Sequence, residues 1–287
     1  MTKIGFIGLG IMGAPMATHL ANAGHHVTGH IRRPDAGRRL IEAGGTTSTT
    51  IAGTVADADV VITMLPNHPE VEEVVDGALA HIRDDTLLID MSSIRPETAI
   101  RTAGRHPRSL DAPVSGGQAG AENATLAIMI GGDADDVAVA RPLFEVLGKT
   151  IVHVGPHGAG QTVKAANQLV VGGIYALVSE AIVLLEASGV DAKAGLDVLA
   201  GGLAGSRILD LKRESMLDRE FTPGFRIDLH HKDMGIAIDA ARQADVALPV
   251  TGLVAQLMAA ARATGFGSLD HSALLRVVES LSGKGKG

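Results

Sequence analysis

The sequence predicts an α/β fold, with a doubly wound, mostly parallel sheet in the first half and an all-α second half joined to it by a long helix. In the first half, short apolar runs alternate with helical patterns, as expected for strands and helices in turn. After Gly160 the strand signal stops, and residues 161–188 form one nearly unbroken helical pattern that ends at Gly189. We therefore expect a first domain over residues 1–157 and a helical domain over 158–287.

The individual elements follow from local pattern. Continuous runs of β-branched and aliphatic residues predict buried strands at 4–7, 27–31, 60–65, 86–91, 109–113, 126–130 and 150–154. Between the first two runs, Met12, Met16 and Leu20 recur at i, i+4 and i+8, which is typical of a helix face that packs on a core.

Composition excludes several classes of function. Lys and Arg number 25 against 32 Asp and Glu, a net charge of −7, so no overall positive field favours nucleic acid or an anionic membrane. Aromatic residues are only 2%, too few for base-stacking surfaces. The absence of cysteine excludes disulfides, thiolate zinc sites and a cysteine nucleophile. Paired histidines occur at 25–26 and 230–231, but without chelating spacing, so no metal site is expected.

Neither secretion nor membrane insertion is expected. The chain passes from Met1 directly into the first strand, without the charged and apolar regions of a signal peptide. The 161–188 helix is long and apolar, but Lys164, Glu180 and Glu186 interrupt it, and charges inside a bilayer are costly. We expect a cytoplasmic protein.

A glycine-rich turn predicts the first functional site. Gly8, Leu9, Gly10, Ile11, Met12 and Gly13 form a GxGxxG that follows an apolar strand and opens a helix. In this Rossmann context the first glycine allows a tight turn, the second lets backbone approach a pyrophosphate, and the third allows close helix–strand packing. A glycine-rich turn that binds nothing is the alternative.

The end of the second strand indicates which dinucleotide is bound. NAD sites usually place an acidic residue there, whereas this chain has Ile31, Arg32 and Arg33. Two guanidinium groups suit a ribose 2′-phosphate, which favours NADP, with NAD still possible. The alternative is a pair of solvated loop charges.

Later strand ends add polar groups at the same sheet edge. We expect Leu65, Pro66 and Asn67 to line the nicotinamide ribose, and Ser93 to lie on the nicotinamide side, although simple turn chemistry explains both segments equally well. The turn at Ser115, Gly116 and Gly117 exposes backbone N–H groups that could hold a carboxylate, or it is an ordinary tight turn. Lys164 and Asn167 share one face of the long helix, where a lysine is more often solvated.

Taken together, these segments resemble the β-hydroxyacid dehydrogenase family that includes 3-hydroxyisobutyrate dehydrogenase. The resemblance runs from Lys3 to about Leu275 and is carried by residues 5–16, 111–117 and 158–167, together with Lys232-Asp233. Segments 63–67, 201–206, 223–230 and 270–274 are most similar to the tartronate semialdehyde reductase branch of that family. Many members carry a second Asn where this chain has Gln168.

The resemblance implies a reaction and roles for individual residues. Lys164 would be the catalytic residue, Ser115–Gly117, Asn167 and Gln168 would bind the substrate acid, and Lys232 would close over the nicotinamide side. An ammonium at Lys164 would stabilise the negative charge that grows on an aldehyde oxygen and deliver the proton. The product would be glycerate, made with NAD(P)H from tartronate semialdehyde (2-hydroxy-3-oxopropanoate).

The sequence is also compatible with other substrates and with a function without catalysis. Another short semialdehyde or β-hydroxyacid, such as succinate semialdehyde or 3-hydroxyisobutyrate, could be the substrate. A regulator that binds NADP without catalysis is possible on the same fold. The family resemblance and the apolar helical half imply a homodimer or homotetramer.

Overall fold

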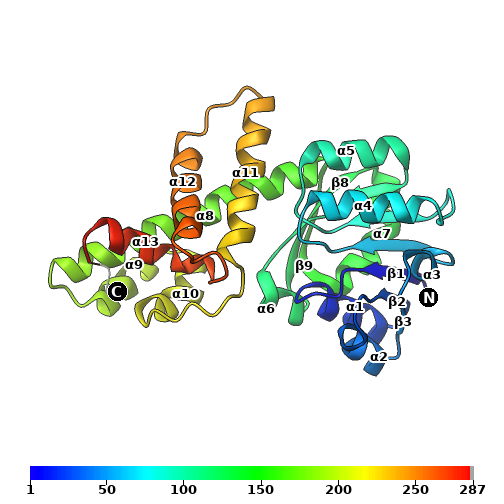
Figure 1. Cartoon of the computed structure of the whole chain (residues 1–287), viewed down its shortest axis with the longest axis horizontal. Coiled ribbons are helices and arrows are strands. Elements are labelled where there is room, and N and C mark those ends of the chain that lie inside the picture. The colour runs from blue at the N-terminus through cyan, green and yellow to red at the C-terminus, as the bar shows by residue number, and fades with distance from the viewer. Residues whose placement is uncertain (285–287) are drawn as a thin grey trace. The chain divides into compact units, whose positions relative to one another are not determined.

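The computed structural model describes residues 1–284, which form two compact units that divide between Lys164 and Ala165. The division falls inside the long helix α8 (Ala159–Ala187), so the first turns of this helix belong to unit 1 and the remainder to unit 2. Figure 1 shows strands and covering helices in the first unit and helices alone in the second.

Unit 1 is built on one sheet in the order β3-β2-β1-β4-β5-β6-β8-β7, with β9 paired to β8. The pairings are parallel except for β6–β8 and β7–β8, which are antiparallel. The strands are β1 (Lys3–Ile7), β2 (His26–His30), β3 (Thr46–Ser48), β4 (Val60–Thr63), β5 (Leu87–Asp90), β6 (Ser109–Asp111), β7 (Val114–Ser115), β8 (Leu126–Gly132) and β9 (Gly148–Gly155).

Helices cover both faces of this sheet. They are α1 (Gly13–Asn22), α2 (Arg38–Glu42), α3 (Ile51–Val55), α4 (His68–Leu79), α5 (Pro96–Arg105), α6 (Gly117–Glu122) and α7 (Ala134–Leu147), with a 3₁₀ turn η1 (Pro34–Gly37). Because side chains alternate along a strand, neighbouring residues of the central strands enter two separate cores.

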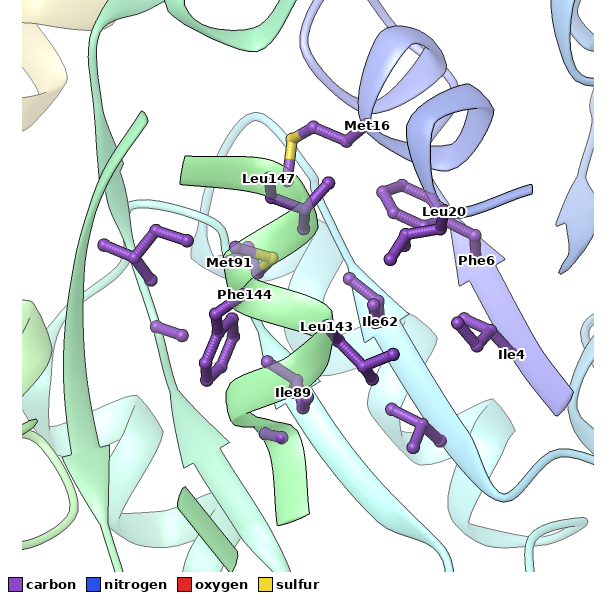
Figure 2. Packing of buried hydrophobic residues seen from close by; sticks show 14 of the residues in the cluster. Ile4, Phe6, Met16, Leu20, Ile62, Ile89, Met91, Leu143, Phe144 and Leu147 are labelled. Atoms are coloured by element: carbon purple, nitrogen blue, oxygen red, sulfur yellow. The ribbon is translucent and has the colours of Figure 1, made fainter. Parts of the chain in front are cut away.

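One core lies against α1 and α7, where Phe6, Ile62 and Ile89 meet Met16 and Phe144 (Figure 2). The opposite core collects residues of the same central strands with residues of α3, α4 and α5. Strands β4 and β5 are buried along their whole length, which explains their continuous apolar sequence. The predicted doubly wound, mostly parallel sheet is confirmed.

Unit 2 packs helices around α8, and no strand occurs among its described residues. The other helices are α9 (Ala192–Gly201), α10 (Arg207–Leu217), α11 (Ile227–Gln243), α12 (Pro249–Ala263) and α13 (Leu274–Leu281), with a 3₁₀ turn η2 (His271–Ala273). Tyr175 and Ile182 of α8 share their core with Leu196, Met234 and Met258. The predicted all-α second half is confirmed.

Helix α8 ends as its sequence predicts. Gly189 adopts a φ of 73°, a left-handed conformation that favours glycine at the end of a helix. By length and composition alone α8 is apolar enough to cross a membrane, a property that core helices of globular proteins share. Its residues Tyr175, Ser179 and Ile182 are buried against other helices of unit 2.

Candidate functional site

The carboxyl ends of the parallel strands in unit 1 lie in register. Thr63 of β4 pairs with Ile7 of β1 and with Asp90 of β5, and Asp90 pairs in turn with Asp111 of β6. On the other side of β1, Ile7 pairs with His30 of β2. The segments that follow these residues therefore emerge at one edge of the sheet, which is where open α/β sheets bind their ligands.

The glycine turn between β1 and α1 has a geometry compatible with a bound pyrophosphate. Gly8 has a φ of 110°, and a side chain there would collide with the Met64 carbonyl, while one at Gly13 would collide with the Gly8 carbonyl. Apart from Gly10 itself and its two chain neighbours, no atom of the described residues lies within 4 Å of a Cβ placed on Gly10. The turn thus leaves space at the N-terminus of α1, whose N–H groups and dipole favour a phosphate.

The other residues of this turn divide between core and solvent. Leu9 and Met12 pack against the unit 1 core, whereas Ile11 is 59% exposed. Met16 is fully buried, as its spacing with Met12 predicts. To a bound phosphate this turn can therefore contribute the backbone N–H groups of Leu9, Ile11 and Met12. The side chains of Leu9 and Met12 are partly occupied in packing.

Arg32 and Arg33 follow β2 after one intervening residue, Ile31, and both are exposed. Arg33 lies 3.7 Å from the Asp35 carboxylate, with both side chains more than three-quarters exposed. An ion pair of this kind contributes little to stability. Both arginines are therefore accessible to an anionic group at this sheet edge.

The loops after β4 and β5 are joined by hydrogen bonds. The Leu65 N–H donates to Ser92 Oγ at 2.9 Å, and Ser93 follows as a half-buried residue. Pro66 follows Leu65. Asn67 is the N-cap residue of α4, and its side-chain oxygen accepts a 3.5 Å bond from the Glu70 N–H. Asn67 thus has a capping role of its own, in keeping with the turn chemistry considered from the sequence.

Beneath these loops lies a buried carboxyl group, Asp90. Its Oδ1 accepts hydrogen bonds from the Thr63 hydroxyl at 2.7 Å and the Ser92 N–H at 3.1 Å. Oδ2 is buried and accepts no hydrogen bond within the part of the chain that the structure describes. Burial raises the pKa of Asp90 to about 6, although its hydrogen bonds with Ser92 and Thr63 favour the charged form.

The Ser115–Gly117 turn joins β7 to α6 through two residues in left-handed backbone regions. Gly116 has a φ of 135° and Gly117 a φ of 61°. These values suit glycine, and Gly116 is exposed while Ser115 and Gly117 are half-buried. Consecutive backbone N–H groups in such a turn can bind an anion. The geometry is compatible with the carboxylate-binding role as well as with a plain turn.

The start of α8 is held by Asp111 at the end of β6. Its Oδ1 accepts from the Gly158 N–H at 2.7 Å and its Oδ2 from the Gln161 N–H at 2.8 Å. Burial raises the pKa of Asp111, while these two bonds act in the opposite direction. Lys164 follows on α8 with only 7% of its surface exposed, so it is not the solvated lysine of the alternative interpretation.

In unit 2, the two residues whose amides are expected to bind the substrate, Asn167 and Gln168, belong to a separate series of hydrogen bonds. The Asn167 amide donates to Gln168 Oε1 at 2.8 Å, and the Gln168 amide donates to the Asp233 carboxylate. The other oxygen of Asp233 lies 3.0 Å from the Lys232 ammonium. The structure thus brings Asn167, Gln168 and Lys232 together through Asp233.

A second polar cluster in unit 2 has no counterpart in the sequence-based prediction. His230 is fully buried, and its Nε2 donates to the Gln168 carbonyl at 3.1 Å. The His271 ring packs against the Tyr175 ring, with centroids 4.0 Å apart and planes tilted by 46°. His271 Nδ1 donates to His230 Nδ1 at 3.0 Å, because the bond to a carbonyl leaves Nδ1 of a neutral His230 as an acceptor. A side chain at Gly172 would crowd the His230 ring, so this glycine lets the imidazole approach α8.

Next to this pair lies the buried carboxylate of Asp270. Lys212 and Ser272 bind its side chain, together with the N–H groups of Gly224 and Phe225. Although burial opposes it, the charges and hydrogen bonds of His271, Ser272 and Lys212 lower the pKa of Asp270 to about 2. No group of side chains suited to a metal ion occurs among residues 1–284.

Comparisons with known proteins agree with this arrangement. Residues 3–155 match the family model for the NAD-binding domain of 6-phosphogluconate dehydrogenase. Residues 158–278 match a second family model, described as the NAD-binding part of NADP-dependent 3-hydroxyisobutyrate dehydrogenase. The chain is 41% identical to 2-hydroxy-3-oxopropionate reductase of Escherichia coli, over 98% of each chain. It is 36% identical to NAD-dependent L-serine dehydrogenase of Pseudomonas aeruginosa, over 99% of this chain and 100% of that one.

A solved structure shows the same fold. The 3-hydroxyisobutyrate dehydrogenase of Mycobacterium tuberculosis, studied with L-serine, superposes with a TM-score of 0.88 at 36% identity, covering 97% of this chain and 99% of that one. The Rossmann unit and the helical unit are therefore those of a dehydrogenase. The chain belongs to the 3-hydroxyisobutyrate dehydrogenase-related family of NAD(P)-dependent β-hydroxyacid dehydrogenases.

Proposed function

We propose that this enzyme reduces tartronate semialdehyde to glycerate with NADPH. The observation that carries the proposal is the burial of Lys164 in the first turns of α8, where Asp111 ties the helix to the ligand-binding edge of the sheet. A buried lysine at this position serves as a proton donor beside the cofactor site. A solvated surface lysine would not be held in place to donate a proton there.

The proposed chemistry needs a hydride, a proton and a fixed substrate. A dinucleotide held at the glycine turn would supply the hydride for the aldehyde carbon. Lys164 stabilises the charge that develops on the aldehyde oxygen and donates a proton to it, so that an alcohol and a neutral amine result. Backbone N–H groups of Ser115–Gly117 hold the substrate carboxylate and thereby orient the aldehyde.

The family resemblance also implies roles for three residues of unit 2. The amides of Asn167 and Gln168 hydrogen-bond the substrate acid, in the roles that the family resemblance implies. Lys232 acts on the nicotinamide side, held by its ion pair with Asp233. The chain of contacts through Asp233 supports a common role for these residues, because it fixes the orientation of each.

We assign the cofactor preference to NADPH because of Arg32 and Arg33. Both are exposed in the segment after β2, and the acidic residue expected for the NAD ribose is replaced by Ile31, which directly follows the strand. A guanidinium group can bind a phosphate with two parallel hydrogen bonds. The glycine turn supports the remainder of the dinucleotide equally for NAD and NADP.

The choice of tartronate semialdehyde is supported by the similarity to the Escherichia coli reductase over nearly the whole chain. The names of the other relatives favour a second candidate, a short β-hydroxyacid such as L-serine or 3-hydroxyisobutyrate, oxidised at the same site. Succinate semialdehyde is a further candidate of the same chemical class.

The test is the initial rate of tartronate semialdehyde reduction with NADPH and, in parallel, with NADH. Rapid turnover that prefers NADPH is expected. Preference for NADH would contradict the assignment of Arg32 and Arg33 but not the substrate. Slow turnover with both, together with rapid turnover of L-serine, 3-hydroxyisobutyrate or succinate semialdehyde, would contradict the substrate assignment.

We also propose that the enzyme is a cytoplasmic homo-oligomer, a dimer or tetramer, rather than a membrane protein. Val170, Leu177 and Leu184 of α8 recur every seven residues and are 55%, 66% and 67% exposed. A heptad stripe of this kind matches the pairing of one helix with a second copy. In a bilayer, Glu180 on the same helix would be unfavourable. Sedimentation of Leu177→Glu should show smaller species than the parent enzyme.

A further inference from the structure

A buried glutamine in the first turn of α8 joins this helix to the loop after β5. Gln161 is only 1% exposed, and its side chain makes two hydrogen bonds with backbone groups. Its Nε2 donates to the Ser92 carbonyl at 2.9 Å, and its Oε1 accepts from the Ile94 N–H at 3.1 Å. One amide therefore satisfies a donor and an acceptor two residues apart on the loop.

The same residue is also held through its main chain. The Gln161 N–H donates to Asp111 Oδ2, while the neighbouring Gly158 N–H donates to Oδ1. The first turn of α8 is thus fixed by the end of β6 through its backbone and by the β5 loop through its side chain. Two attachments of different direction restrict rotation of the helix about its axis as well as its displacement.

This attachment lies one turn ahead of Lys164. Residues i and i+3 of a helix lie on the same face, so the face that contacts the loop at Gln161 also carries Lys164. On the loop, Ser92 also accepts the Leu65 N–H, and Ser93 is the next residue. The Gln161 amide therefore joins the helical turn that precedes Lys164 to the loop after β5, which we expect on the nicotinamide side.

We propose that Gln161 is a positioning residue for the reduction, which sets the place of Lys164 relative to the 92–94 loop. The proposal rests on the function proposed above, in which Lys164 donates the proton. Loss of the amide leaves the Ser92 carbonyl and the Ile94 N–H without their partner, so the helix and loop can shift relative to one another. Misplacement of a catalytic group by about 1 Å can lower a rate by roughly 100-fold.

The experiment is a double-mutant cycle between Gln161→Leu and Lys164→Ala. With native Lys164, we expect Gln161→Leu to lower kcat by roughly 10- to 100-fold and to change the NADPH Kd by less than about threefold. In the Lys164→Ala background, the same substitution should lower kcat no further, because there is no proton donor left to position.

Thr162→Ala is the matched control. Thr162 is the next residue of the same turn and is exposed, and its hydroxyl donates to the Gly158 carbonyl, in the turn just before α8. Its loss should leave kcat within about twofold of the parent value, because the attachment to the loop is retained.

Gln161→Glu provides a second variant of nearly the same size, with a pH readout. Ionised, the carboxylate still accepts the Ile94 N–H but faces the Ser92 carbonyl without a proton to donate. Protonated, it can donate to that carbonyl again. We expect the kcat of this variant, relative to the parent enzyme at each pH, to recover as the pH is lowered, whereas Gln161→Leu should show no such recovery.

Two results would overturn the positioning role. One is an equal kcat loss from Gln161→Leu with and without Lys164, which would show an effect independent of the lysine. The other is a parent-like kcat for both Gln161 variants. The Lys164→Ala arm alone reports on the proposed function: if that single variant loses turnover while the cycle shows no coupling, the inference fails and the function stands.

Discussion

The two units of the molecule bury polar groups in different ways. In unit 1 they gather at the carboxyl ends of the strands, where Asp90 and Asp111 bind loops and a helix terminus beside apolar cores. In unit 2 they lie within the helical core itself, where His230 and His271 pair beside Tyr175. We infer that changes in unit 1 alter activity more than stability, and that the reverse holds in the histidine cluster of unit 2.

The largest expected effect tests the unit 1 side of this comparison. Lys164→Ala should lower kcat by roughly 10²–10⁴, because the proton donor and the charge that stabilises the aldehyde oxygen are both lost. The NADPH Kd and the unfolding midpoint in urea should change little. Stopped-flow rates, titration of NADPH fluorescence and urea unfolding measure the three quantities.

Lys149→Ala is the control for this substitution, since Lys149 is an exposed residue on β9. It should leave all three quantities unchanged. Near-normal turnover in Lys164→Ala would exclude the lysine as the proton donor.

Asp90 is an exception to this rule within unit 1, because the titration of its buried carboxyl group affects stability. Burial raises the pKa of Asp90 to about 6 from its usual 3.8. The folded state therefore binds the proton more tightly than the unfolded state does. This contribution to stability is fully present below pH 3.8 and is lost as the pH rises through about 6. At 1.36 kcal/mol per pKa unit, the loss amounts to about 3 kcal/mol.

Asp90→Asn, which mimics the protonated carboxyl group, should remove this dependence. The free energy of unfolding of the variant, minus that of the parent, should rise by up to about 3 kcal/mol between pH 4 and pH 8. Urea unfolding at both pH values measures it. Asp59→Asn, at the other end of β4 and half-exposed, is the control. A difference that stays constant with pH would show that Asp90 is charged in the folded protein.

For unit 2, His230→Phe should destabilise the fold by about 2 kcal/mol, because the buried Nδ1–H of His271 loses its acceptor. The double variant His230→Phe/His271→Phe should cost less than the sum of the two single variants, since both partners then become apolar. Urea unfolding of the three variants completes the cycle. If the effects of the two single variants on the free energy of unfolding were strictly additive, the hydrogen bond between the two histidines would contribute nothing to stability. Packing alone would then explain the destabilisation.

The sequence predicted the elements whose pattern is local. Strands β4 and β5 are buried on both faces and therefore read as continuous apolar runs, and the helix expected at 161–188 is α8 at Ala159–Ala187. Strands β3 and β7 were not predicted, because the first is a three-residue edge strand of Thr and Ser and the second has two residues. Their pairing partners, not their own sequences, make them strands.

The candidate site likewise contains features that follow from a local sequence pattern and features that depend on residues far apart in the chain. The glycine turn follows from spacing along one segment, whereas the hydrogen bond from Gln161 to Ser92 joins positions 69 residues apart, and the His230–His271 bond joins positions 41 apart. No pattern along the chain marks such pairs. A polar residue in the otherwise apolar face of a helix is the signal that was available for Gln161 and His230, and it gives the burial but not the partner.

The smallest expected effect concerns residues that belong to neither core. Arg32→Ala should raise the KM for NADPH by roughly tenfold and leave that for NADH unchanged, because only the 2′-phosphate interaction is lost. Arg33→Ala should act in the same direction. Arg38→Ala is the control, since Arg38 is exposed and pairs with Glu42 within α2. Steady-state rates with both cofactors give the ratio. If both KM values rise equally, the arginines support the whole dinucleotide rather than its phosphate, and exposed residues at this sheet edge then contribute to binding but not to selectivity.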